Sequence, residues 1–412
     1  MKSYNLILIL FFATFNLRSI VAQTLHPGDV APNAKVIDAD VMHEFNNGAA
    51  IVQKGNSDAL IDINGNFIVP FNKYKFNYFE LGAKGIYNGI FSLQLGHEAL
   101  NTKGELIAKG LNLVSRTSKD GRYRFATARD GLLAINSDDQ RFLVKGTNGI
   151  IGLSGFSEGM IVYWTGNAGN MKFGFKNLMD QIVIQPAYDK VGLFSDGMAL
   201  VGCKNEFGEM KYGFINKEGQ QVIPCMYTNK PSDFYCGRSL VYPKDRTEFE
   251  YAYINKKGEI AIKYTREMSQ KYGDLYQGFY NGYTFGSVVM DTTGKIYTYP
   301  QFFAKYGVAN PTDKNLKLNF PTSQDEWTDG EVFMFSRFDF NNRAGSTTGF
   351  IDVTTNKVVE GPFTNTQLYF DPVSKLAYAE MHVKDGTNIV IKKGYINMQG
   401  IFVIVKREDS KW

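Results

Sequence analysis

The sequence of 412 residues is poor in the residue types that build metal sites and catalytic sites, with three cysteines and four histidines. The cysteines, Cys203, Cys225 and Cys236, have no histidine partners at the spacing of a zinc site. The histidines lie in different regions and no Gly-x-Ser-x-Gly segment accompanies them, which favours structural over catalytic roles. We therefore expect no cofactor, no metal site and no enzymatic activity.

An odd number of cysteines leaves at least one of them outside any intramolecular bridge. Cys203 lies on an apolar run, whereas Cys225 and Cys236 lie near predicted turns, so the sequence assigns no pair. An oxidising compartment would permit a bridge. Buried, unpaired cysteines acting as small apolar side chains are an equally good interpretation.

An excess of one charge sign is also missing, because 45 Lys and Arg residues face 41 Asp and Glu residues. Removing residues 1–22 takes away Lys2 and Arg18 and no acid, which leaves 43 basic against 41 acidic residues. This balance argues against a dedicated partner among nucleic acids or anionic membranes. We expect no nucleic acid partner.

Residues 1–22 are typical of a secretory signal peptide. A basic start at Lys2 is followed by an apolar run over residues 6–13 and by the small residue Ala22 before Gln23. The run is shorter than a membrane span of roughly 20 residues, and Arg18 follows it closely. We expect an exported protein, periplasmic or extracellular, with no transmembrane segment after cleavage of the signal.

One sequence phrase recurs, most clearly over residues 156–264. It opens as Phe-Ser-Glu-Gly-Met, then as Phe-Ser-Asp-Gly-Met, and more weakly as Phe-Tyr-Cys-Gly-Arg. The glycines of these openings, Gly159, Gly197 and Gly237, lie 38 and 40 positions apart. This period is typical of propeller blades and solenoid coils.

Each unit also carries a predicted hairpin tip, which reads Asp or Asn, two further residues and Gly. Good copies begin at Asp62, Asn216 and Asn397. The Asp or Asn side chain can accept hydrogen bonds from the backbone, and the glycine can adopt the positive φ of a bulge. Counting weaker copies gives about nine units of three clear strands and a possible fourth.

A single unit is too small to fold alone. Ordering about 40 residues costs roughly 1 to 2 kcal/mol per residue, whereas six to eight buried apolar side chains return only about 1.5 to 3 kcal/mol each. The units must therefore stack. We predict an all-β fold, a β-propeller-like array of antiparallel three- to four-stranded repeats of about 40 residues, with an elongated β-solenoid as the alternative. Residues 24–40 are predicted to pair with the terminal strand at 401–405 and to close the ring.

Residues 301–327 depart furthest from the repeat. The segment contains Pro311 and Pro321 and lengthens the spacing between neighbouring tips. We interpret it as a non-repeat insertion.

The recurring motifs resemble the WG-repeat family, which combines this opening with an aromatic-Gly-aromatic strand, a Lys-x-Gly turn and a Val-Ile-Pro close. The match is best over residues 194–227. The Trp-Gly pair that gives the family its name does not occur at the repeat positions of this sequence. The Trp position is held by Phe173, Tyr212, Thr348 and Lys393, and in one further unit Ala252 replaces the glycine. The resemblance implies that residues 23–412 form a WG-like β-repeat domain. Members of this family are often exported and bacterial, and the resemblance implies no catalytic residues in this chain.

An acid or amide precedes the opening glycine at Asn47, Glu158, Asp196, Asn281 and Asp329. These residue types are turn formers before glycine. Converging on the axis of a propeller, they could alternatively supply oxygen ligands to a hard cation such as Ca²⁺. The turn interpretation is favoured.

The sequence is rich in aromatic residues, with 32 Phe and 24 Tyr, and most of them recur at repeat positions expected in the core. Three lie outside this register: Trp164 in the predicted loop before Gly166, Tyr306, and Trp327. Exposed aromatic side chains with polar neighbours can stack on sugar rings or anchor a protein partner. These three are the candidate ligand contacts.

Together these features predict a non-enzymatic scaffold that binds a protein or glycan partner at the bacterial cell envelope. One alternative is a carbohydrate-active hydrolase with carboxylates at a propeller channel, which requires a pocket with at least two convergent acids of perturbed pKa. Another is a purely structural envelope component, which would show no deep pocket and a large apolar outer patch.

Overall fold

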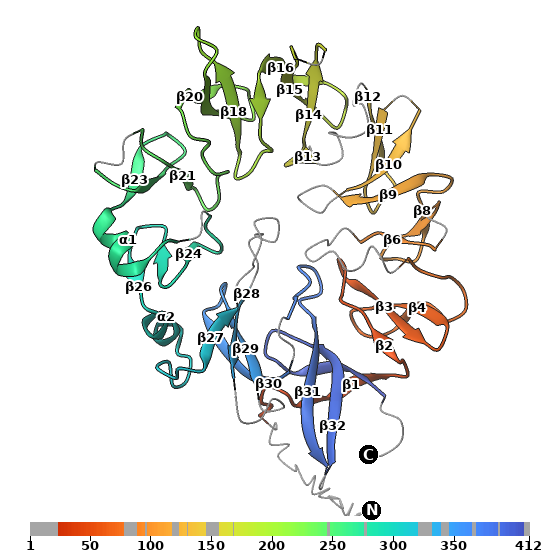
Figure 1. Ribbon diagram of the computed structural model, residues 1–412. Coiled ribbons are helices and arrows are strands. Elements are labelled where there is room, and N and C mark those ends of the chain that lie inside the picture. The colour runs from red at the N-terminus through yellow and green to blue at the C-terminus, as the bar shows by residue number, and fades with distance from the viewer. Residues whose placement is uncertain are drawn as a thin grey trace, which may run out of the picture.

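The computed structural model describes most of the chain after residue 23, namely residues 24–77, 89–94, 97–117, 123–129, 131–145, 156–167, 169–244, 248–275, 278–319, 332–338, 346–364, 368–385 and 388–407. The predicted signal peptide and Trp327 therefore lie outside the described residues. Small antiparallel sheets follow one another around a ring (Figure 1). The predicted all-β class is confirmed. Among the described residues, no helix is long and apolar enough to cross a membrane.

Seven of the sheets hold three or four strands each, as the repeat predicts. The first three are β2 (Val41–Met42), β3 (Ala49–Lys54), β4 (Ser57–Asp62) and β5 (Phe67–Val69); β6 (Phe91–Ser92), β7 (Ala99–Leu100) and β8 (Leu106–Ile107); and β9 (Asn112–Thr117), β10 (Arg124–Ala128), β11 (Gly131–Ile135) and β12 (Arg141–Lys145). The next two are β13 (Phe156–Ser157), β14 (Met160–Thr165), β15 (Lys172–Asn177) and β16 (Ile182–Tyr188), and then β17 (Lys190–Val191), β18 (Met198–Lys204), β19 (Met210–Asn216) and β20 (Gln221–Tyr227). The last two are β21 (Ser239–Val241), β22 (Tyr251–Ile254) and β23 (Ile260–Tyr264), followed by helix α1 (Arg266–Tyr272), and β24 (Tyr283–Phe285), β25 (Val289–Asp291) and β26 (Ile296–Tyr297), followed by helix α2 (Tyr299–Tyr306).

An eighth, eight-stranded sheet joins the two ends of the described chain. It contains β27 (Leu316–Asn319), β28 (Val332–Arg337), β29 (Thr347–Asp352), β30 (Lys357–Phe363), β31 (Ala377–Asp385), β32 (Asn388–Ile396), β33 (Phe402–Lys406) and β1 (Val30–Ile37). Strands β30 and β31 share a single register pair, Phe363 with Met381, so the sheet is two four-stranded units joined edge to edge. Strand β1 runs parallel to β33, which confirms the predicted pairing of the N-terminal segment with the terminal strand.

Part of the segment predicted to be an insertion belongs to regular structure. Residues 301–306 lie in α2, and β27 is the first strand of the eight-stranded sheet. Residues 320–327 lie outside the described part of the chain. The described part of the segment, residues 301–319, thus joins two neighbouring sheets.

Neighbouring sheets are held together by a repeated pair of aromatic rings. The aromatic residue after the central-strand glycine packs on the opening Phe of the next unit, with ring centroids 4.9 Å apart for Phe175 and Phe194 and 4.8 Å for Phe214 and Phe234. The same contact joins the last unit to the first, where Tyr395 lies 4.6 Å from Phe45. The buried clusters likewise draw residues from two adjacent sheets. The core therefore lies between units, as the stacking argument requires.

The hairpin tips form as the sequence predicts. The Asp62 carboxylate accepts hydrogen bonds of 2.8 Å from the backbone N–H groups of Asn64 and Asn66. Gly65 has a positive φ of 74° at the bulge. In two weaker copies Asp139 and Asp180 themselves adopt positive φ where the better copies have glycine. The turn geometry is thus retained after its preferred residue is lost.

The glycine of the aromatic-Gly-aromatic strand is required by close backbone contact. A β-carbon added at Gly213 would lie 2.4 Å from the Ile223 carbonyl oxygen, and one added at Gly174 would lie 2.3 Å from that of Ile184. A register irregularity between β19 and β20 brings the edge strand this close. At Ala252, where the glycine is replaced, the register with β23 is regular, so a methyl group fits.

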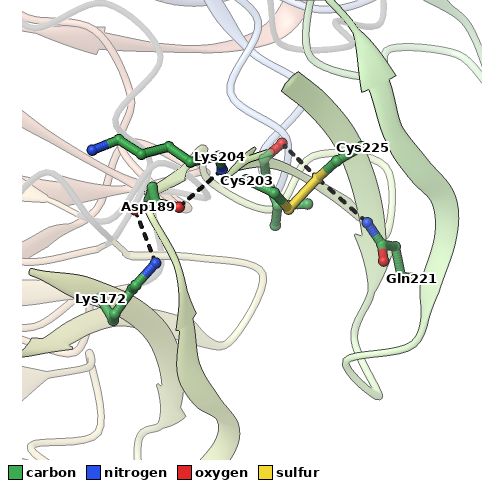
Figure 2. The surroundings of a disulfide bond; sticks show 7 residues. Lys172, Asp189, Cys203, Lys204, Gln221 and Cys225 are labelled. Carbon is green, nitrogen blue, oxygen red and sulfur yellow. Dashed lines mark hydrogen bonds and ion pairs between the residues drawn. A yellow bond between two sulfur atoms is a disulfide. The ribbon is translucent and has the colours of Figure 1, made fainter. Parts of the chain in front are cut away.

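A disulfide joins Cys203 to Cys225 (Figure 2). The bridge links β18 to β20, which are the two neighbours of β19 in the same sheet. Beside it, Lys172 forms an ion pair of 2.9 Å with Asp189, which also accepts a hydrogen bond of 3.1 Å from the backbone N–H of Lys204. The pairing, which the sequence left open, therefore ties one unit together, and Cys236 lies outside it.

Candidate ligand-binding site

The turns that open the units also bind each unit to the next. Glu158 and Asp196 adopt positive φ, as does the glycine after each, which confirms the turn interpretation. The Glu158 carboxylate accepts a hydrogen bond of 3.1 Å from the backbone N–H of Gly197 in the next unit. It also forms an ion pair of 3.0 Å with Lys217, at the hairpin tip of that unit. We call this carboxylate, glycine and lysine contact the latch.

The latch recurs one unit further along. Asp196 accepts a hydrogen bond of 2.5 Å from the N–H of Gly237 and pairs with Lys256 at 2.7 Å. Both carboxylates thus have partners from the chain itself. The alternative of a cation bound by convergent acids has no support in the described residues, where no group of three or more His, Cys, Asp or Glu side chains could hold a metal ion.

The latch changes at Cys236, the next position of the series. The Cys236 sulfur accepts a hydrogen bond of 3.3 Å from the N–H of Gly282. Arg238 donates to the carbonyl oxygen of Thr292, with contacts of 3.1 and 2.9 Å from two nitrogens. Thr292 lies at the same place in its hairpin tip as Lys217 does in its own. This junction between two units is therefore held by a different set of hydrogen-bonding groups.

At the following junction the latch residues are replaced by uncharged ones, and a cavity opens. Asn281 stands in the place of Glu158, and Val353 in the place of Lys217. A cavity of about 620 Å³ lies here, between the sheet of β24–β26 and the tip of β29 and β30. It is lined by Asn281, Tyr283, Asp291, Thr293, Lys305 and Tyr306, among others. We call it the α2 pocket.

Helix α2 supplies two of the side chains that line the pocket. The Thr298 hydroxyl accepts a hydrogen bond from the N–H of Gln301, whose side chain accepts one of 2.9 Å from the N–H of Thr298. This capping box starts the helix, and Gly307 ends it in the left-handed conformation with φ of 81°. Phe302 and Phe303 bury the helix against the core. The last turn therefore holds Lys305 and Tyr306 in fixed positions.

Lys305 lies among three tyrosine rings in the pocket. Its Nζ atom is 4.9 Å from the ring centre of Tyr283, 5.2 Å from that of Tyr306 and 5.5 Å from that of Tyr297. It donates a hydrogen bond to the Tyr283 hydroxyl. Burial acts to lower its pKa, but this bond, the neighbouring phenols and the Asp291 carboxylate raise the pKa of Lys305 above its ordinary value. The group is therefore an ammonium cation at neutral pH.

Asp291 is the carboxylate of the pocket, and the chain already occupies its oxygens. One oxygen accepts hydrogen bonds from the N–H and hydroxyl of Thr293 and the N–H of Lys295, at 2.9, 2.6 and 3.1 Å. The other accepts one of 3.0 Å from the Tyr297 hydroxyl. Burial acts to raise its pKa, but these donors hold the pKa of Asp291 below its ordinary value. Asp291 is ionised and serves as the tip of a hairpin.

The structure separates the three aromatic residues predicted to contact a ligand. Tyr306 is half-buried and lines the α2 pocket. Trp164 lies in another sheet, on β14 and not in a loop, because β14 continues to Thr165 in register with β15. Trp327 lies outside the described residues. Lys305 and Tyr283 were not predicted as site residues, although the Thr298 and Gln301 capping box is a readable signal for the helix that carries Lys305.

A second cavity, of about 610 Å³, lies beside the sheet of β6–β8. Lys73, Lys75, Lys109 and His97 line it, together with Glu98. Residues 78–88 and 95–96, adjacent in sequence to this lining, are outside the described residues.

The ring of small sheets, the inter-unit aromatic pairs and the latch define the molecule as an all-β repeat protein. Residues 173–206 and 212–242 match the family model for the WG containing repeat. The chain therefore carries WG repeats, and the resemblance predicted from its motifs is confirmed at these residues. No curated protein matches the chain significantly.

Several solved structures of peptidases and hydrolases align with most of the chain at low similarity. A structure from work on two prolyl endopeptidases shares 12% identity and a TM-score of 0.32, covering 88% of this chain and 54% of its own. A puromycin hydrolase shares 10% identity and a TM-score of 0.28, covering 90% and 55%. Prolyl oligopeptidase B from Galerina marginata shares 10% and 0.29, covering 86% and 54%. The chain thus spans just over half of the length of these proteins, and likeness at this level says nothing about its activity.

Proposed function

We propose that the protein is a β-propeller of nine units that acts as a non-enzymatic glycan-binding scaffold at the bacterial cell envelope. The observation that carries the binding proposal is the α2 pocket, where the charged latch gives way to Asn281 and Val353. Its volume of about 620 Å³ falls within the range of roughly 300 to 1,000 Å³ that small ligands occupy in proteins.

The propeller proposal rests on contacts that join the last unit to the first. Tyr395 packs on Phe45, and β33 pairs with β1. An elongated solenoid would leave its two end units apart, so it would form neither contact. Two four-stranded units in the eight-stranded sheet and seven separate sheets make up the nine.

Export to the envelope is supported by two independent features. Residues 1–22 have the pattern of a signal peptide. The bridge between Cys203 and Cys225 suits an oxidising compartment. Sequencing the N-terminus of the exported protein tests this part, and a start at Gln23 is expected.

The chemistry of the α2 pocket favours a sugar over an apolar ligand. A half-buried tyrosine ring, Tyr306, lies beside hydroxyl and amide groups from Thr293 and Asn281. Sugars present both C–H faces and hydroxyl groups, so they use aromatic and polar partners together. A hydrolase needs a second carboxylate near the first. Asp291 is the carboxylate in the described lining, and its hydrogen bonds are already made within the chain, so the hydrolase alternative is less well supported. The cavity also disfavours a purely structural role.

The test is a screen of immobilised glycans and envelope proteins with the protein starting at Gln23, alongside Tyr306→Ala. Deleting residues 301–327 would remove most of α2 and all of β27, so point variants are preferable. We expect glycan binding that is lost in Tyr306→Ala and kept in Trp164→Ala, its aromatic control in another sheet. Binding of no glycan, or equal binding by both variants, would overturn the proposal. Retention of a protein in place of a glycan would favour a protein-binding scaffold.

A further inference from the structure

Lys305 and Tyr283 bring hydrogen-bond donors into the α2 pocket. An ammonium group carries three N–H donors. Lys305 directs one of them to the Tyr283 hydroxyl, and among the described residues it has no ion pair with a carboxylate. Two donors of Lys305 are therefore available to a ligand.

The Tyr283 hydroxyl adds another donor. It accepts from Lys305 and, at 3.1 Å, from the Tyr306 hydroxyl. These two bonds fill its acceptor positions and leave its own O–H proton to donate. Tyr306 and Tyr283 thereby form a chain of hydrogen bonds, and the Tyr283 O–H at its end is available to donate beside the Lys305 ammonium group.

The carboxylate of the pocket is by contrast already in use. Asp291 receives four hydrogen bonds within its own hairpin. It therefore does not offset the charge of Lys305 through a direct contact. A donor-rich site whose cation is attracted by Asp291 at a distance but has no ion-pair partner among the described residues favours a ligand that brings oxygen acceptors and negative charge.

Repeat geometry explains why the charge is available here. At Lys217 and Lys256 the cation that faces an opening turn is paired with a carboxylate of the previous unit. At the α2 pocket the corresponding acid position holds Asn281, which is uncharged, and the cation comes from a helix.

From these contacts, and resting on the proposed glycan-binding function, we propose that the α2 pocket binds an acidic saccharide, with Lys305 and the Tyr283 hydroxyl holding a uronate carboxylate. Tyr306 positions Tyr283 through its hydroxyl and offers its ring to the sugar.

The test is isothermal titration of the protein with uronate oligosaccharides built from galacturonate, glucuronate or mannuronate, each compared with its neutral methyl ester. Because charge-assisted hydrogen bonds are stronger than neutral ones, we expect at least one acid form to bind roughly tenfold or more tightly than its ester. Inorganic phosphate is the probe for simple anion binding, and it should not compete at equal concentration.

Three variants locate the effect. Lys305→Met should weaken binding of the acid roughly tenfold and leave the ester unchanged, whereas Lys305→Arg, which keeps the charge, should retain most of the affinity. Lys295→Met is the matched control, because Lys295 lies 5.0 Å from the Tyr297 ring but outside the pocket lining. It should bind as the wild type does. Urea unfolding of each variant shows whether it is folded.

The outcomes separate the two proposals. Equal binding of acids and esters would overturn the acidic class and leave a neutral glycan site. Equal competition by phosphate would reassign the pocket to free anions. If no saccharide binds, both proposals fail together. Loss of acid binding in Lys295→Met as well as in Lys305→Met would overturn the role given to Lys305.

Discussion

The carboxylate of Asp371 accepts a hydrogen bond of 2.5 Å from the backbone N–H of Asn47, a residue 324 positions earlier in the chain. It accepts two more, of 3.0 Å from Gly48 and 2.7 Å from Ser374. Asp371 is fully buried and directly follows Phe370. Its carboxylate accepts from Gly48 as that of Glu158 accepts from Gly197, and so it ties the end of the ring to the beginning.

Replacing Asp371 by Ala should open this junction. Three backbone donors would lose their acceptor, and a buried donor left unsatisfied costs about 1 to 3 kcal/mol. We expect the free energy of unfolding to fall by on the order of 3 kcal/mol, measured by urea denaturation. Asp138→Ala, at an exposed hairpin tip, should change it by less than about 0.5 kcal/mol. Equal losses in the two variants would contradict the assigned closure.

The central-strand glycine should tolerate no side chain where the edge strand is irregular. In Gly213→Ala the new methyl group would lie 2.4 Å from the Ile223 carbonyl oxygen. Strain of this kind costs about 1 to 3 kcal/mol, and thermal unfolding should show it as a lower Tm. Ala252→Gly makes the reverse change where the register is regular, and it should cost about 1 kcal/mol through lost packing and added chain freedom. A neutral Gly213→Ala would refute the contact.

Removing the bridge should destabilise the sheet of β17–β20. The two cysteines are 22 positions apart, and closing a loop of this size stabilises a fold by about 3 kcal/mol in the chain-entropy account. We expect Cys203→Ala with Cys225→Ala to lose on that order of stability, and reductant to have the same effect on the wild type. Cys236→Ser is the control for a thiol outside the bridge: reductant should destabilise this variant by as much as it destabilises the wild type. A non-reduced peptide map that lacks the Cys203 to Cys225 fragment would contradict the assignment.

Stability should depend on pH through Glu44, beside the closing junction. Burial raises its pKa to about 7, although the N–H of Tyr378 acts to lower it. Since the folded state then binds the proton more tightly than the unfolded chain does, stability falls as pH rises from about 4.5 to about 7. Glu44→Gln removes this loss. Its advantage over the wild type should grow across that window to on the order of 1 to 3 kcal/mol and stay constant above it.

The neighbouring His43 changes stability with pH in the opposite direction to Glu44. Burial lowers its pKa, so its own contribution to stability rises as pH increases toward 6.5. That contribution is present in both proteins and cancels in the difference between them. Glu218→Gln, at an exposed tip, controls for the change in net charge. A difference that is independent of pH would show that Glu44 does not titrate in this window.

The sequence predicted what each unit needs locally. Asp62 and Gly65 indicate a hairpin tip, because the conformation of that turn depends on one side chain and one φ value. The pairing of β1 with β33 was also predictable, since two unpaired ends of a repeat array have complementary edges. The family resemblance followed from the same local motifs.

Contacts between units could not be derived from the sequence in the same way. Glu158 is a turn former on any reading, but the distance from it to Lys217 depends on how two sheets stack. Cys203 and Cys225 become partners only once β19 is known to lie between their strands. Trp164 was expected in a loop because Gly166 follows it, whereas pairing with Phe173 extends the strand. Lys305 and Tyr283 meet only after α2 has folded back over its sheet.

The parallel pairing of Val36 with Val405 sets a limit on how this molecule can be made. Nearly the whole polypeptide must have been synthesised before the first strand can find its neighbour. The earlier units can assemble by local contacts, but the final sheet waits for a partner separated by hundreds of residues, and such non-local pairing is slow. Until then two strand edges stay open to other chains. We therefore expect closure of the ring to be the slowest step in the folding of the protein. It is also the stage at which the chain most needs protection from aggregation.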